Sequence, residues 1–215
     1  MDEEPEIEIV EEKESVWKGP LKWVIAGFIL LILVSWTFSY YAVKVDPEPT
    51  YIPTLAEVVG TLHVENVTHE VNGRYDFKRF ITPSDPELKR VASNIASISC
   101  DSAQYVCQAK AIYYFVQRNI KYVPDPKQDY VESPKETLLT GAADCDGMAV
   151  LLATLEEAIG VNARLVFIPG HVYVELKLND GPNKYKQWFP VDATCKDCRF
   201  GEVPASNAEK DIVII

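Results

Sequence analysis

The chain begins with a mixed polar segment, continues in one long apolar run, and then alternates apolar and polar positions at regular periods. Residues 23–43 read WVIAGFILLILVSWTFSYYAV and carry no charge over 21 residues. A helix of this length rises about 31 Å, close to the hydrocarbon thickness of a bilayer. Trp23, Trp36 and Tyr40 stand toward its ends, where aromatic side chains favour the membrane interfaces. The pattern predicts a transmembrane helix over residues 23–43.

Downstream of this run, helical periods come first and strand periods follow. Capping residues and apolar positions at helical spacing predict helices over residues 86–99, 102–119, 134–139 and 145–159. Runs rich in β-branched and aromatic residues predict strands over residues 164–168, 172–178, 184–191 and 212–215. A hairpin is predicted over residues 62–81 because Asn72 and Gly73 are a favoured turn pair. Helices followed by an antiparallel sheet indicate an α+β fold.

The chain divides into four segments. Residues 1–22 hold eight acidic and three basic side chains, which predicts a flexible, solvated acidic tail. The transmembrane helix at 23–43 comes next. Three prolines within residues 46–53 predict a stiff linker, bounded here at 44–58. Residues 59–215 remain for one folded domain, which is long enough to bury a core.

The charged residues argue against one class of partner and predict the orientation of the membrane helix. The 215 residues include 21 Lys and Arg against 32 Asp and Glu, a net charge of −11, which argues against binding to nucleic acid. Lys13, Lys18 and Lys22 closely precede the apolar run, whereas Lys44 stands alone after it. The positive-inside rule therefore predicts an uncleaved single-pass anchor with a cytoplasmic N-terminus and an extracytoplasmic C-terminal domain. The lipid bilayer is thus one expected partner.

Three residues in the C-terminal half suggest chemistry. Cys145 opens an apolar helix, where the macrodipole favours a thiolate. The flanking Asp144 and Asp146 oppose this effect, so a cationic neighbour is required. His171 begins a predicted strand after a Pro-Gly turn, and Asp192 ends the next one. The order suggests a nucleophile, a base, and a carboxylate that orients the base.

These motifs resemble a known family. The sequence Ala-Asp-Cys145-Asp-Gly before an apolar helix, Gly-His171-Val-Tyr-Val-Glu, and Trp188 followed by Asp192-Ala-Thr are similar to the transglutaminase-like superfamily of papain-fold thiol enzymes. The resemblance covers roughly residues 85–204, and is nearest to small prokaryotic, especially archaeal, members fused to one membrane helix. It implies helices packed on an antiparallel sheet, with Cys145 as nucleophile, His171 as general base and acid, and Asp192 orienting His171.

The resemblance also implies a reaction. A membrane-anchored thiol hydrolase would cleave a peptide or isopeptide amide of a protein or peptide substrate through a thioacyl intermediate, without a cofactor or metal. Transfer of the acyl group to an amine is the other outcome of the same intermediate. The alternative is a non-catalytic domain of this fold that serves binding or assembly at the membrane.

Four further cysteines stand as two close pairs. Cys100 and Cys107 form the first, and Cys195 and Cys198 the second. Outside the cytoplasm such pairs form disulfides, within or between the pairs. A structural zinc site with four cysteine ligands is a second interpretation, because Cys195 and Cys198 have metal-ligand spacing. Free thiols are the third.

Overall fold

The computed structural model describes residues 19–63, 71, 73–101, 104–124, 130–207 and 212–215, and it divides the chain into two compact units. The first unit is Met1–Lys44 and the second is Val45–Ile215. Most of the predicted acidic tail, together with Asn72 of the predicted hairpin, lies outside the described residues.

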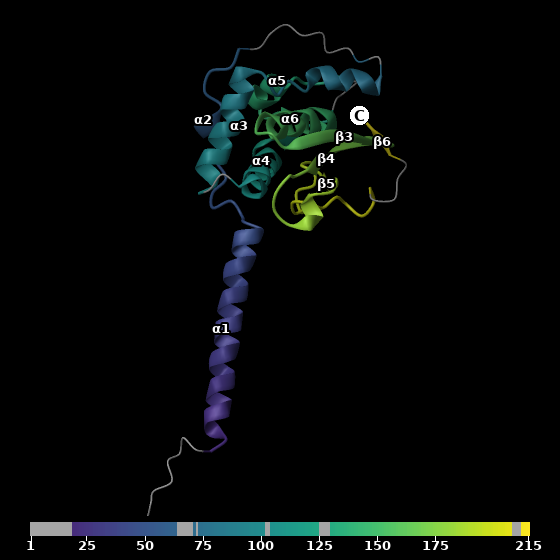
Figure 1. Cartoon of the computed structure of the whole chain (residues 1–215). Helices are drawn as coiled ribbons and strands as arrows, with labels where there is room; N and C mark the ends of the chain where they lie inside the picture. Colours follow the sequence, from purple (N-terminus) through teal and green to yellow (C-terminus); the bar gives the residue numbers. More distant parts are fainter. Residues whose placement is uncertain (1–18, 64–70, 72, 102–103, 125–129, 208–211) are drawn as a thin grey trace, which may run out of the picture. The chain divides into compact units, whose positions relative to one another are not determined.

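Helix α1 spans Leu21–Val45, two residues longer at each end than the predicted apolar run (Figure 1). Its window Leu21–Phe38 is long and apolar enough to cross a membrane, and no part of this window is buried in the structure. A signal sequence near the N-terminus meets the same criterion of length and composition. The helix itself is therefore confirmed.

The remaining α-helices lie in the second unit. They are α2 (Leu55–Val58), α3 (Pro86–Ser99), α4 (Tyr105–Asn119), α5 (Pro134–Thr140) and α6 (Cys145–Ala158). The predicted caps explain several of these bounds. Asp85 accepts hydrogen bonds from the backbone of Glu87 and Leu88 at 2.8 and 3.2 Å, and Ser133 accepts one from Glu136 at 3.3 Å. The four predicted helices are confirmed, except that residues 102–103 are outside the described part.

The main sheet has four antiparallel strands in the order β5-β4-β3-β6. Their bounds are β3 Asn162–Ile168, β4 His171–Lys177, β5 Phe189–Val191 and β6 Val213–Ile214, and a parallel pair joins β1 (Lys121–Tyr122) to β2 (Ala142–Ala143). The strand predicted over 184–191 is wrong in its first half. There, the 3-10 helix η3 (Asn183–Tyr185) buries Tyr185, whose ring packs 4.8 Å from Phe189 and 5.4 Å from Phe200.

The predicted hairpin over 62–81 is also wrong where the structure describes it. Arg74–Phe80 forms a 3-10 helix, η2, instead of a second strand. Phe77 and Phe80 are both buried, and residues three apart lie on one face of a 3-10 helix. The ring of Phe77 packs against Phe167 of β3 with centroids 5.0 Å apart. This packing places η2 against the sheet, where it forms a wall of the site described below.

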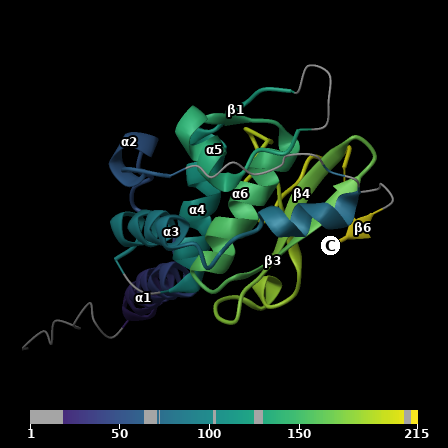
Figure 2. The ribbon, with the colours of Figure 1, turned by 90° about the horizontal axis from the view of Figure 1, so that it is seen from above.

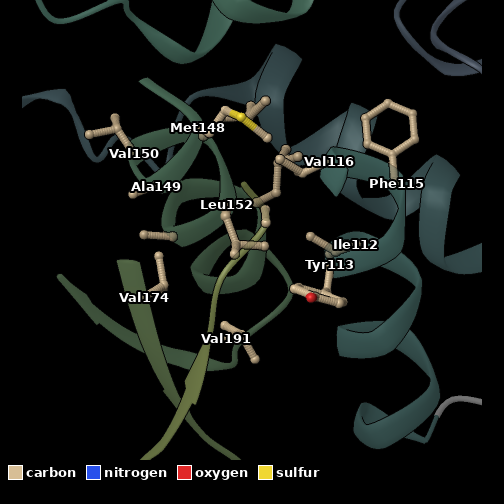
Figure 3. Close-up of a cluster of buried hydrophobic side chains, with 14 of the residues drawn as sticks. Ile112, Tyr113, Phe115, Val116, Met148, Ala149, Val150, Leu152, Val174 and Val191 are labelled. Atoms are coloured by element: carbon tan, nitrogen blue, oxygen red, sulfur yellow. The ribbon is translucent and has the colours of Figure 1, made fainter. Parts of the chain in front are cut away.

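Helix α6 is the centre of the second unit. It lies between the α3–α4 pair and the sheet, as the view from above makes clear (Figure 2). Side chains of α4, α6 and the sheet meet in one buried cluster, including Ile112 and Tyr113 of α4, Leu152 of α6, and Val191 of β5 (Figure 3). Because α6 is covered on several sides, its sequence is apolar nearly all round. The prediction of helices packed on an antiparallel sheet is confirmed.

Residues 46–50 of the predicted linker lie in the second unit and contact α3 and α4. Lys110 of α4 is 2% exposed, and its Nζ lies 2.6 Å from Asp46 and 2.5 Å from Glu48. The backbone N–H of Thr50 donates to the carbonyl of Ser99 at 2.9 Å. Burial disfavours a charged lysine, but the two carboxylates more than compensate and raise the pKa of Lys110.

Candidate active site

The first turn of α6 carries Cys145. Asp144 is its N-cap, and the side-chain Oδ1 of Asp144 accepts hydrogen bonds from the backbone of Asp146 at 2.9 Å and of Gly147 at 3.3 Å. Cys145 is partly buried and is the free cysteine of the chain, because the other four form the disulfides Cys100–Cys107 and Cys195–Cys198. A single thiol thus stands at a helix N-terminus.

His171 and Asp192 come from neighbouring strands. The turn before His171 uses Gly170 at a φ of 76°, a conformation that favours glycine. Val174 of β4 pairs with Val191 of β5, which brings the residue after β5 beside the start of β4. As a result, Nε2 of His171 lies 2.8 Å from Oδ2 of Asp192.

Asp192 is held firmly as an anion. Its side chain is 1% exposed, and its second oxygen, Oδ1, accepts hydrogen bonds from the Thr194 backbone at 3.0 Å and hydroxyl at 2.6 Å. Burial alone would raise the pKa of Asp192, but the hydrogen bonds from His171 and Thr194 outweigh it and hold that pKa below its ordinary value. A buried carboxylate that stays charged can fix the orientation of an imidazole.

Cys145 and His171 line one cleft of about 370 Å³. One wall comes from η2 and the residues before it, and the other from the β3–β4 turn. The residues around the opening are mostly apolar, with one cation and one carboxyl group; they are Val71, Gly73, Arg74, Phe77, Asp146, Phe167, Ile168, Gly170 and Val172. The structure therefore brings Cys145 and His171 to one cleft. Asp192 is not among the lining residues but contacts His171 through a hydrogen bond.

The surroundings of Cys145 disfavour a thiolate, and Asp144 contributes to this effect in the direction that the sequence predicts. Burial, followed by the charge of Asp144, raises the pKa of the Cys145 thiol to about 11, although the backbone N–H of Val172 lowers it. The helix N-terminus therefore does not by itself yield a thiolate at neutral pH. A thiol in this environment needs a base to take its proton at the moment of attack.

Three carboxyl groups gather at the first turn of α6. One oxygen each of Glu132, Asp144 and Asp146 lie within 4.8 Å of one another, an arrangement in which a cation could be held. Burial, a hydrogen bond with Asp144, and the nearby negative charges raise the pKa of Asp146 to about 9. These surroundings favour the protonated form of Asp146.

Gly147 lets Glu132 approach the helix closely. A Cβ at position 147 would collide with Oε2 of Glu132 and lie 2.8 Å from the Cβ of Ala143. We expect Gly147→Ala to destabilise the protein by about 1–3 kcal/mol through overpacking. The matched control is Gly73→Ala, because nothing lies within 4 Å of a Cβ there. Thermal unfolding of both variants measures the difference, and equal melting temperatures would contradict the prediction.

Sequence reasoning missed one wall of the cleft. Arg74 and Phe77 reach it only because η2 packs on the sheet, and no local motif signals this contact. Tyr122 was missed as well. It pairs in register with Ala143. Burial is the largest cause that raises the pKa of Tyr122, and the charges of Cys145 and Asp144 raise it further. Tyr122 therefore lies near the nucleophile. Strands β1 and β2 have two residues each and are too short to give a recognisable residue pattern.

The comparison with protein families agrees with this fold. Residues 90–193 match the family described as the transglutaminase-like superfamily. Solved structures similar to this chain include LapG of Legionella pneumophila, at 16% identity over 64% of this chain and 79% of that one, with a TM-score of 0.41. A candidate cysteine protease from Cytophaga hutchinsonii matches at 20% identity over 67% and 52%, also with a TM-score of 0.41. The comparison with curated proteins gives no match. The family match spans all three predicted site residues.

Proposed function

Because residues 90–193 form a domain of the transglutaminase-like superfamily, we propose that this protein is a membrane-anchored thiol hydrolase acting on peptide or isopeptide amides. The observation that carries the proposal is the pairing of His171 with the buried Asp192, 2.8 Å apart, at a cleft that Cys145 also lines. A free thiol, an imidazole and an orienting carboxylate are the groups that covalent amide hydrolysis requires.

In the proposed first step, Nδ1 of His171 takes the proton of the Cys145 thiol as the sulfur attacks the amide carbonyl. Nδ1 is available because Nε2 faces Asp192. The backbone N–H of Cys145, at the start of α6, is a candidate donor to the developing oxyanion. His171 then protonates the leaving nitrogen, the C–N bond breaks, and a thioester remains.

In the second step, a water molecule gives a proton to His171 and attacks the thioester. The C–S bond breaks, the sulfur recovers a proton from His171, and a carboxylic acid leaves. An amine in place of water would give acyl transfer through the same intermediate. The cleft residues favour neither acceptor, so hydrolysis is proposed from the small size of the domain.

The same proposal includes a location. We propose that α1 anchors the chain in the membrane in a single pass, with the N-terminus in the cytoplasm and the domain outside. The lysines before the helix support this orientation. The disulfides Cys100–Cys107 and Cys195–Cys198 also support it, because disulfides persist in oxidising compartments.

The alkylation rate of Cys145 tests the role of His171. Cys145 is the free cysteine, so iodoacetamide under non-reducing conditions reports on it alone. With a thiol pKa of about 11, the reaction at pH 7 depends on a base, and we expect His171→Ala to slow it roughly 100-fold. The full-length protein in detergent is used, and mass spectrometry identifies the modified residue.

The control for this test is His63→Ala. His63 is an exposed histidine paired with Glu87 and is not among the residues lining the cleft. Its replacement should leave the rate unchanged. Equal rates in the wild type and in His171→Ala would favour the alternative, a binding module without catalysis.

A further inference from the structure

The segment that follows Asp192 forms a compact loop closed by a disulfide. Cys195 donates its backbone N–H to the carbonyl of Asp192 at 3.2 Å, and Cys198 donates to the carbonyl of Cys195 at 3.4 Å. The Cys195–Cys198 disulfide joins the two ends of the second turn. Asp192 is thus the first residue of a closed loop of successive turns.

A buried amide on α4 binds this loop. Gln117 is 5% exposed, and its Nε2 donates to the carbonyl of Cys195 at 2.6 Å and to that of Cys198 at 2.9 Å. Two carbonyls three residues apart can face one amide only when the turn between them is closed. The contact therefore requires the closed turn, which the disulfide and the backbone hydrogen bond from Cys198 to Cys195 both hold.

Tyr113 links the loop directly to Asp192. Its buried hydroxyl lies 3.1 Å from the carbonyl of Cys198, 3.3 Å from that of Asp192 and 3.1 Å from Nε2 of Gln117. Burial raises the pKa of Tyr113, so the hydroxyl keeps its proton and remains a donor. Gln117 and Tyr113, one helical turn apart, thus present donors to a row of loop carbonyls.

We infer that Gln117 and the Cys195–Cys198 disulfide are positioning elements that hold Asp192, and through it His171, in the orientation needed for proton transfer. This inference rests on the proposed function. Without the disulfide, the turn regains conformational freedom and the carbonyls no longer converge on Gln117. Without the amide, the partly buried carbonyls of Cys195 and Cys198 lose a donor. In both cases the Asp192 carboxylate is less sharply fixed beside His171.

The test measures Cys145 alkylation by iodoacetamide across pH in full-length variants. Gln117→Leu removes the donor at similar volume, and we expect it to slow alkylation at pH 7 by about 10- to 100-fold, which is the effect of a small displacement of a reacting group. Its pH profile should approach that of His171→Ala. The matched control is Gln108→Leu, on the same helix, whose side chain is not among the donors to the loop.

The disulfide is tested by a second pair of variants. Cys195→Ser with Cys198→Ser keeps Cys145 as the single free thiol, and it should show the same loss. Cys100→Ser with Cys107→Ser removes the other disulfide, and its rate and pH profile should remain those of the wild type. If Gln117→Leu fails to fold, the Cys195/Cys198 serine pair carries the test, because it leaves the buried packing of α4 intact.

Reference variants separate the inference from the proposed function. If His171→Ala and Asp192→Asn slow alkylation but Gln117→Leu and the Cys195/Cys198 serine pair do not, the inference is overturned and the proposed function stands. If none of the four has an effect, both are overturned. If the Gln117 and disulfide variants change only the melting temperature and leave the pH profile in place, the loop has a structural role and the inference also fails.

Discussion

Replacing Cys145 with serine is expected to reduce amide hydrolysis by on the order of 10⁴-fold or more. The loss follows from the proposed mechanism, in which His171 removes a thiol proton and a thioester forms. A hydroxyl is far less acidic than a thiol, and Asp144 already opposes negative charge at this position. The measurement is the release of amine from a library of fluorogenic peptide amides by the full-length protein in detergent.

The first control for this prediction is the thermal stability of the variant. Serine is nearly isosteric with cysteine, so the variant should melt at a temperature close to that of the wild type. Cys100→Ser with Cys107→Ser also replaces cysteines, here a disulfide-bonded pair that does not line the cleft, and it should retain activity. Hydrolysis by Cys145→Ser within tenfold of the wild type would rule out Cys145 as the nucleophile.

Replacing Glu156 with glutamine is expected to stabilise the protein at neutral pH. Glu156 lies fully buried in α6, and within the described part of the chain neither carboxylate oxygen has a hydrogen-bond partner. Burial raises its pKa well above the ordinary value. The native state therefore keeps a proton that the unfolded chain releases above pH ~4.3.

The sign of the pH dependence follows from this difference. The contribution of Glu156 to stability is fully present below the unfolded pKa and falls by about 1.4 kcal/mol per pH unit until the folded pKa is reached. Glutamine cannot titrate, so the advantage of Glu156→Gln should grow from pH 4 upward. Thermal unfolding followed by circular dichroism at pH 4, 6 and 8 measures it.

Glu157→Gln is the matched control for this series. Glu157 is the neighbouring residue, only partly buried, and the positive charge of Lys78 partly offsets the effect of burial on its pKa. Its replacement should change stability much less at every pH. A constant difference between Glu156→Gln and the wild type across the three pH values would contradict the prediction.

The sequence was most informative where local chemistry decides structure. Helices α3 and α5 begin directly after Asp85 and Ser133, because each of these side chains caps its helix and a proline follows. Both signals can be recognised within four residues of sequence. It was least informative around Arg74 and Tyr185. Both segments read as strands, yet tertiary packing of Phe77 and Tyr185 selects 3-10 turns.

The same contrast applies to the site. Cys145, His171 and Asp192 stand at the ends of strongly patterned elements, so their approach could be anticipated from the order of helix and strands. Gln117 could not be anticipated. It lies on α4, far from Asp192 along the chain, and only the tertiary fold brings its amide to the disulfide-closed loop.

The spacing of the cysteines bears on how the chain matures. Each disulfide joins residues close in sequence, with separations of seven and three, and short loops close most readily. Cys145 is distant from both pairs. During oxidative folding, we therefore expect each local pair to form its own disulfide before Cys145 forms one with another cysteine. The linear arrangement thereby favours a chain in which both local pairs are oxidised and Cys145 keeps its thiol.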